Sequence, residues 1–144
     1  MKPVRYFDSS ALVKRYIRES ETPLVASLLA ESEVVVSRIA EAEVASALGR
    51  ACRDAKMTHA DASRAMADLR KELELSRVVE VTSAVTALAS ALLLRRPLRS
   101  LDAIQLASCL LVAERTKNPI ELVVFDARLV EAAVAEGLSI RPKR

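Results

Sequence analysis

A chain of 144 residues is long enough for one domain with a hydrophobic core, so we expect a single domain over residues 1–144. The net charge of +3 is too small to indicate nucleic-acid binding by itself. With two glycines and one histidine, the composition excludes a glycine-rich nucleotide loop, a Ser-His-Asp triad and a multi-histidine metal site.

No secretion signal is expected at the start of the chain, because Met1-Lys-Pro-Val leads directly into a predicted strand. The most apolar stretches are residues 85–94 and 103–113. Both fall short of the roughly 20 residues that a membrane span requires. We therefore expect buried helices, no membrane association and a cytoplasmic protein.

The first predicted elements are a strand and a helix that meet at Asp8. The apolar run before this acid is typical of a strand, and the spacing of Ala11, Leu12, Tyr16 and Ile17 is typical of a helix. Asp8 is therefore expected either to cap the helix or to project from the strand end into a crevice.

A second helix is predicted from Thr22-Pro23 to about residue 31, a strand at 33–36, and a third helix from residue 37 to about 56. Glu43 lies on the apolar stripe of the third helix, unlike the nearby Glu41. A buried acid is costly without a partner or a metal. Glu43 is therefore a candidate site residue, and a buried pair with an arginine is the alternative.

A helix is predicted from Thr58 to Ser76, a strand at 78–81, a helix from residue 82 to 95, and another that Ser100 caps. The alternation of strands and helices does not require the 58–76 helix, which would serve as a flap or as part of a dimer interface. Asp102 falls in the first turn of the helix after Ser100, where the helix dipole favours an acid. Capping alone would explain this residue.

The last part of the chain repeats the arrangement of the first. A strand at 121–125 ends at Asp126, a helix follows from 127 to 136, and a short strand is predicted at 138–140. Such alternation predicts an α/β fold, with helices on both faces of a central parallel sheet of four to five short strands. Ligands of such sheets bind beyond the carboxyl ends of the strands.

Once the other chemistries are excluded, carboxylate chemistry remains. Convergence of Asp8, Glu43, Asp102 and Asp126 would create strong repulsion, which a divalent cation relieves. Magnesium and manganese prefer such oxygen ligands and would activate water for phosphodiester hydrolysis. Basic residues near helix ends would either hold phosphates or form ordinary solvated faces; they include Arg50, Arg53, Lys56, Arg95, Arg96 and Arg99.

Four segments together resemble the PIN-domain ribonucleases, and most closely the VapC-type toxins of toxin-antitoxin pairs. They are YFDSSALV, AEVASAL, LRSLDAIQLAS and VVFDARLVEAA, in the order of that family and over nearly the whole chain. The resemblance implies a PIN-like three-layer α/β/α sandwich and a Mg²⁺- or Mn²⁺-dependent endoribonuclease. It also implies an RNA substrate, a homodimer and a cognate antitoxin that blocks the site. The residues that it implies as the metal and catalytic site are Asp8, Glu43, Asp102 and Asp126.

Three positions in or next to these motifs bear on the metal site or on the packing of the first strand. Ser10 matches a small polar position that would orient Asp8 through a hydrogen bond. Val124 replaces the Ser or Thr that many members carry two residues before the last acid, which weakens the case for a second metal position. Arg5 stands where members carry an aliphatic residue, and either a place at the sheet edge or an acidic partner would explain it.

Two other function classes are less consistent with the sequence. A PIN-like module that only binds RNA or protein would have no reason to keep four acids that repel one another. A phosphotransfer domain of the receiver or phosphatase type needs a second acid next to the first or two residues from it, and Ser9 and Ser10 occupy those places.

Overall fold

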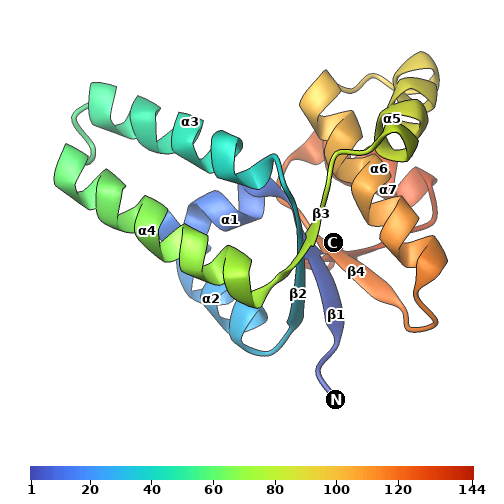
Figure 1. The fold of residues 1–144 in the computed structure, drawn as a ribbon, viewed down its shortest axis with the longest axis horizontal. Coiled ribbons are helices and arrows are strands. Elements are labelled where there is room, and N and C mark those ends of the chain that lie inside the picture. The colour runs from blue at the N-terminus through green and yellow to red at the C-terminus, as the bar shows by residue number, and fades with distance from the viewer.

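The computed structural model describes residues 1–144 and contains a five-stranded, fully parallel sheet with the order β3-β2-β1-β4-β5 (Figure 1). The chain starts in the middle of the sheet, builds one side and then crosses over to build the other. The order therefore reverses between β1 and β4, where such sheets bind ligands. The strands are β1 (Val4–Phe7), β2 (Glu33–Ser37), β3 (Arg77–Val79), β4 (Ile120–Val123) and β5 (Ser139–Arg141).

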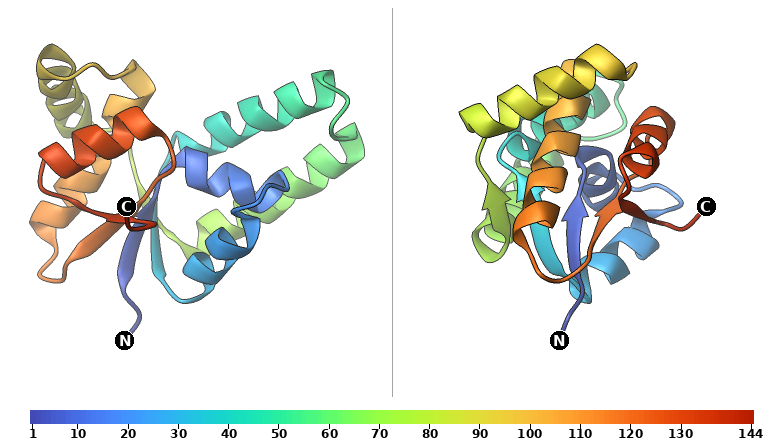
Figure 2. Two further views of the ribbon diagram at one scale, coloured as in Figure 1. Left: turned by 180° about the vertical axis from the view of Figure 1, so that it is seen from behind. Right: turned by 90° about the vertical axis from the view of Figure 1, so that its right-hand side faces the viewer.

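Seven helices cover both faces of the sheet (Figure 2), so the predicted three-layer α/β/α sandwich is confirmed. One face is packed by α1 (Ser9–Tyr16), α2 (Thr22–Ala30), α3 (Ala40–Arg53) and α4 (His59–Leu75). The other face is packed by α5 (Ser83–Arg95), α6 (Ser100–Arg115) and α7 (Ala127–Ala135).

The alternation of side chains along β1 divides the core into two clusters. Tyr6 is fully buried among residues of α5, α6 and α7, whereas Phe7 is fully buried among residues of α1 to α4. Asp8 comes next in the chain, at the carboxyl end of this central strand. The packing of both faces therefore fixes where the first candidate acid lies.

Helix ends were predicted well where a side chain caps them. Both helices start where they were predicted to start: Thr58 caps α4 by accepting a hydrogen bond from Asp61 N, and Thr82 caps α5 by accepting one from Val85 N. The third helix begins later than predicted, at Ala40, because residues 37–39 finish β2 and form a turn. Arg99 rather than Ser100 is the N-cap of α6, and it makes no side-chain capping bond.

Arg5 has acidic partners and does not lie at the sheet edge. It is 6% exposed on the central strand, where its Nε lies 2.9 Å from Glu121 Oε1 and its Nη1 lies 2.9 Å from Glu31 Oε1. Arg141 Nε lies 2.7 Å from the other Glu121 oxygen. We call Arg5, Glu31, Glu121 and Arg141 the Arg5 ion-pair cluster, and every charge in it has an opposite partner.

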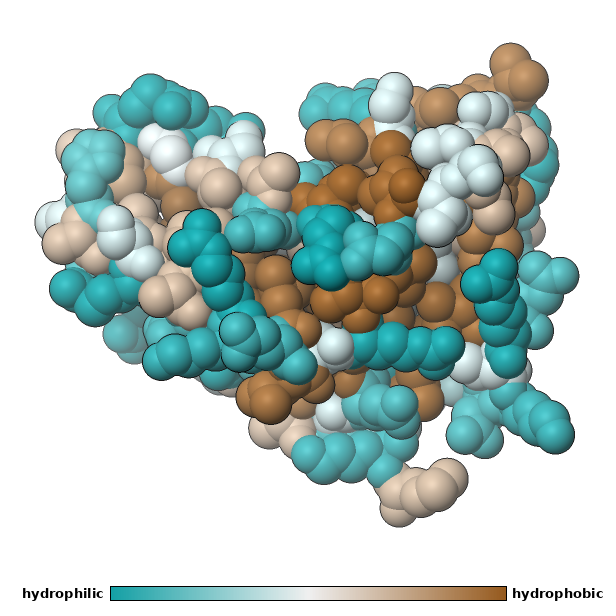
Figure 3. Space-filling view, in the orientation of Figure 1, coloured by the Kyte–Doolittle hydropathy of each residue, from teal (hydrophilic) through white to brown (hydrophobic).

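The hairpin of α3 and α4 forms an arm that extends away from the sheet (Figure 1). The space-filling view shows a hollow between this arm and the part of the molecule formed by α5 and α6 (Figure 3). The helix predicted as an extra element, α4, buries Ala65, Leu69 and Leu73 in the core on the α1 to α4 side.

None of the helices combines the length and apolar character needed to cross a bilayer.

Candidate active site

Asp8 lies at the junction of β1 and α1 and is 4% exposed. Its Oδ2 accepts hydrogen bonds from Ser10 N at 3.2 Å and from Ser10 Oγ at 2.6 Å, so it caps the helix while remaining beyond the strand end. Burial raises the pKa of Asp8 to about 6 even though the Ser10 hydrogen bonds lower it, and the charges of Glu43 and Asp102 raise it further. The two roles considered for Asp8 are therefore compatible.

Ser10 joins the two strand ends that flank the switch point. Its hydroxyl donates to Asp8 and accepts a hydrogen bond from Phe125 N at 3.3 Å. Phe125 immediately precedes Asp126, so this contact fixes the end of β1 against the segment that follows β4. Ser10 thereby holds Asp8 in one orientation beside that segment.

Glu43 projects from α3 and is half-buried. Its Oε1 accepts hydrogen bonds from Ser9 Oγ at 2.7 Å and from Gln105 Nε2 at 2.8 Å. The arginine considered as a partner for this residue is not there, since both donors are neutral. No lysine or arginine of the protein therefore forms an ion pair with Glu43 in this partly desolvated position.

Asp102 is half-buried in the first turn of α6, where it was expected. Burial raises its pKa most, the negative charges of Asp126 and Glu43 add to the rise, and Arg99 opposes it. Capping does not fully explain this residue, because it shares an electrostatic environment with acids from three other parts of the chain.

Asp126 is the outermost of the four acids. Its side chain is exposed and caps α7 by accepting a hydrogen bond from Leu129 N at 3.0 Å. Its charge contributes to the raised pKa of Asp102. Asp126 therefore lies at the rim of the acidic group, with a visible role in capping.

The structure brings the acids close enough for their charges to interact. Glu43 and Asp102 raise the pKa of Asp8, and Asp126 and Glu43 raise the pKa of Asp102. In this arrangement of side chains, no three of the acids gather closely enough to hold a single ion. The chemistry of the donors nevertheless suits a hard cation, because they are carboxylates that no lysine or arginine neutralises through an ion pair. Metal binding by these four residues remains a prediction.

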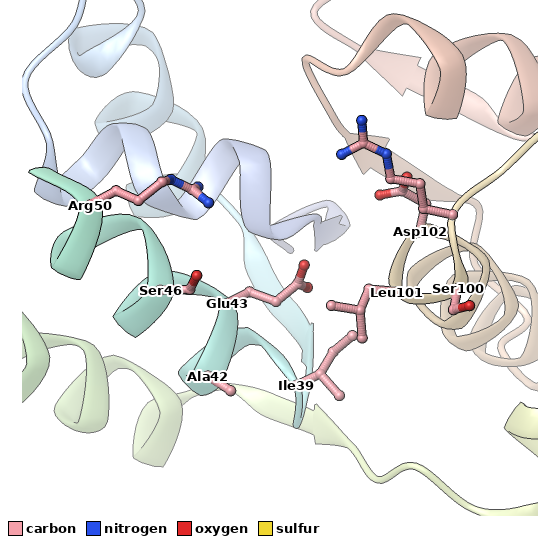
Figure 4. Close-up of a pocket in the computed structure, with 9 residues that line it drawn as sticks. Ile39, Ala42, Glu43, Ser46, Arg50, Ser100, Leu101 and Asp102 are labelled. Carbon is pink, nitrogen blue, oxygen red and sulfur yellow. The ribbon is translucent and has the colours of Figure 1, made fainter.

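A pocket of about 510 Å³ is lined by two of these acids, Glu43 and Asp102. The carboxylates of Glu43 and Asp102 point toward the space between α3 and α6 from opposite sides, and Arg50 extends from α3 toward the same space (Figure 4). Arg99 is the second basic residue of the lining. The complete lining is Ile39, Ala42, Glu43, Ser46, Arg50, Arg99, Ser100, Leu101 and Asp102.

Two buried polar residues of this region were not predicted. Gln105 is 1% exposed and contacts Glu43, while Tyr6 is fully buried and donates to Gln105 Oε1 at 2.6 Å. The sequence does carry a signal for Gln105, because it is a polar residue among Ala103, Leu106 and other apolar residues of α6. The same reasoning identified Glu43 on α3.

Comparisons with known proteins identify the family of this chain. Residues 5–135 match the model of the PIN domain family, so the chain belongs to that family. Within it, the chain stands with the VapC ribonucleases, since it is 33% identical to Ribonuclease VapC45 of Mycobacterium tuberculosis over 97% of this chain and 96% of the relative.

Solved structures with the same fold include two toxin structures. Mycobacterium tuberculosis VapC20, described as a Sarcin-Ricin loop cleaving toxin, superimposes with a TM-score of 0.68 at 22% identity, over 93% of this chain and 95% of that one. A toxin-antitoxin complex from Klebsiella pneumoniae gives a TM-score of 0.61 at 19% identity, over 86% of this chain and 88% of that one. These likenesses confirm the PIN-like fold.

Proposed function

We propose that this chain is a Mg²⁺- or Mn²⁺-dependent endoribonuclease and the toxin of a toxin-antitoxin pair. The observation that supports this most is the group of Asp8, Glu43 and Asp102 at the switch point of the sheet, where no cation of the protein pairs with them. Retention of so much uncompensated charge by a VapC family member is explained if a divalent ion binds there. A module that only binds RNA or protein would gain nothing from this cost.

Asp8, Glu43, Asp102 and Asp126 would hold the ion and accept the hydrogen bonds of its bound water. A bound ion supplies a water of lowered pKa and neutralises charge on the scissile phosphate and its leaving oxygen. Asp8 is the most buried of the four, and Ser10 orients it. We assign it the most direct role in binding the ion.

The substrate is proposed to be RNA, bound through its phosphates by Arg50 and Arg99. These arginines line the acidic pocket from α3 and from the start of α6, and neither forms an ion pair with an acid of the protein. Each is free to neutralise a phosphate on one side of the scissile bond. The acids thus act on one phosphodiester while the flanking arginines position the strand.

A protein partner is part of this proposal. The similar Klebsiella pneumoniae structure is a toxin-antitoxin complex, and we propose that a cognate antitoxin covers the pocket of this chain. We further propose that the toxin is a homodimer that acts on RNA in the cytoplasm. The arm of α3 and α4 stands beside the pocket and is the element through which either partner would limit access (Figure 3).

The experiment is cleavage of labelled RNA in Mg²⁺ or Mn²⁺, with and without a chelator. The wild-type protein should cut RNA only when the metal is present, and Glu43→Gln should lose that activity. Glu41→Gln is a matched control on the same helix, because Glu41 pairs with Arg70 at 3.1 Å outside the pocket and should leave cleavage unchanged. A folded wild-type protein that cuts no RNA with either metal would contradict the proposed function.

A further inference from the structure

A chain of hydrogen bonds leads from the core of the protein to Glu43. Tyr6 Oη donates to Gln105 Oε1 at 2.6 Å, and Gln105 Nε2 donates to Ser9 Oγ and to Glu43 Oε1, both at 2.8 Å. Ser9 Oγ in turn donates to Glu43 Oε1 at 2.7 Å. We call Tyr6, Ser9 and Gln105 the Glu43 support chain.

The direction of every bond in the support chain follows from the chemistry of its members. The phenol donates its single proton to Gln105, which makes the amide oxygen face Tyr6 and the NH₂ group face Ser9 and Glu43. Because the hydroxyl of Ser9 accepts from Gln105, its own proton is free to reach Glu43. Two such bonds on one carboxylate oxygen hold the side chain of Glu43 in one orientation.

The support chain also connects the elements that carry the other acids. Tyr6 and Asp8 are two residues apart at the end of β1, Ser9 is the first residue of α1, and Gln105 follows Asp102 by three residues on α6. Residues three apart on a helix lie on the same face, so Asp102 and Gln105 point to one side of α6. The bond from Gln105 therefore fixes Glu43 relative to Asp102, and the bond from Ser9 fixes it relative to Asp8.

The residues of the support chain are buried, so their hydrogen bonds cannot be exchanged for bonds to water. Tyr6, Ser9 and Gln105 are 0%, 5% and 1% exposed, and all their buried polar atoms have hydrogen-bond partners. A buried glutamine without partners is costly, so the amide has little freedom to turn away. Glu43 Oε2, in contrast, receives no hydrogen bond from the protein.

We propose that Tyr6, Ser9 and Gln105 are positioning residues that saturate one oxygen of Glu43 and leave the other oriented for a divalent ion. This inference rests on the proposed function and adds residues that never touch the ion or the RNA. Gln105 acts directly on Glu43, and Tyr6 acts only by setting the orientation of the Gln105 amide.

The test is Mn²⁺ binding to the full-length protein, followed by the loss of the electron paramagnetic resonance signal of free Mn²⁺. Gln105→Met keeps the volume and removes both donors, so the dissociation constant should rise by about tenfold or more. Tyr6→Phe removes one hydroxyl far from the ion, and the expected rise is smaller, about threefold. RNA cleavage by both variants should recover toward the wild-type kcat at saturating Mn²⁺.

Ser32→Ala is the matched control. Ser32 is also a buried hydroxyl, which accepts a hydrogen bond from Arg5 and donates one to Leu28 O, but it lies before β2, away from the acids. This variant should lose stability and keep the wild-type dissociation constant for Mn²⁺. A purely structural support chain would make Gln105→Met behave in the same way as this control.

Each outcome gives a clear answer. If the wild-type protein binds Mn²⁺ and a folded Gln105→Met binds it within twofold of wild type, the positioning role is wrong and the proposed function stands. If the wild-type protein neither binds Mn²⁺ nor cleaves RNA, both fail. Should Gln105→Met not fold, Tyr6→Phe and Ser9→Ala decide the question, since each removes only a hydroxyl.

Discussion

Two carboxylates in different parts of the sheet, Glu121 and Asp8, have pKa values shifted in opposite directions. Glu121 lies in the Arg5 ion-pair cluster, where burial acts to raise its pKa but hydrogen bonds from Arg141 and Arg5 outweigh it, so the pKa is lowered. Asp8 lies beyond the carboxyl end of β1, where burial raises the pKa to about 6 and neighbouring acids raise it further. The same fold thus compensates negative charge in one region and accumulates it in another.

The presence or absence of an ion-pair partner distinguishes charges with a structural role from charges that are candidates for function. An ion pair with every charge compensated, such as Arg5 with Glu121, needs nothing from outside the protein. A group such as Asp8, Glu43 and Asp102 destabilises the fold unless something positive binds it. The contrast between the two regions therefore supports the prediction of a ligand site at Asp8, Glu43 and Asp102, and this support does not depend on any relative.

The largest effect is expected from Asp8→Asn. Asparagine keeps the size of the side chain and removes the charge, so RNA cleavage should fall by at least about 10³-fold in kcat/KM. The metal-free protein should at the same time become more stable, by on the order of 2 kcal/mol at neutral pH, because a buried ionised carboxylate is removed. Cleavage assays and chemical denaturation in a chelator measure the two effects. A variant that lost both activity and stability would contradict the idea that Asp8, unlike Glu121, destabilises the metal-free protein.

Glu121→Gln should give the opposite pattern. Arg5 is almost fully buried and would lose one of its two acidic partners, so the free energy of unfolding should fall by about 2–3 kcal/mol. Cleavage and Mn²⁺ binding by the folded protein should stay at wild-type levels, because Glu121 lies outside the acidic pocket. Urea denaturation and a metal titration on the same preparation test this. A large change in Mn²⁺ affinity would show that the two regions are coupled.

The pH dependence of the stability of the metal-free protein should report the raised pKa of Asp8. Its pKa is raised from 3.8 to about 6, so its contribution to stability is complete below pH 3.8 and is lost as the pH rises through about 6. Glu121, with a lowered pKa, contributes above pH 4.5 and loses its contribution as the pH falls. The stability advantage of Asp8→Asn over wild type should therefore grow between about pH 4 and pH 6 and then level off. Denaturation curves in a chelator across that range measure it, and a constant difference would contradict the raised pKa.

The smallest effect is expected from Arg50→Ala. One phosphate contact would be lost, so KM for RNA should rise by about three- to tenfold while kcat changes little. Arg53→Ala is the matched control, because Arg53 lies on the same helix but does not line the pocket. The salt dependence of RNA binding should become shallower for Arg50→Ala alone. Equal effects of the two substitutions would indicate only a general electrostatic attraction.

Local patterns in the sequence predict most of the fold, because strands, helices and caps depend on nearby residues. The helix starts at Thr58 and Thr82 were predicted from the few residues that follow them, and both threonines cap their helices. The start of α3 was misplaced because Ser37 and Ile39 suit either a strand end or a helix start. Periodicity likewise indicated that Glu43 faces inward, and its half-buried side chain agrees.

Contacts between distant segments were the part that local patterns could not supply. Gln105 meets Glu43 across 62 positions of the chain and Tyr6 across 99, and nothing near Gln105 indicates which residues it will contact. Arg5 was left without an assigned partner for the same reason, since Glu121 lies 116 positions away. Helical spacing predicts the face on which a side chain lies, whereas only the tertiary fold determines what it meets.

The strand order has a consequence for synthesis of the protein. β1 is made first but stands in the centre of the sheet, and its neighbour β4 begins only at Ile120. Because proteins emerge from the ribosome amino end first, β1 lacks one of its neighbours until most of the chain has been translated. Asp126 comes later still. Under the proposed function, a nascent or prematurely terminated chain that lacks Asp126 would therefore have an incomplete set of acids and would not yet cleave RNA.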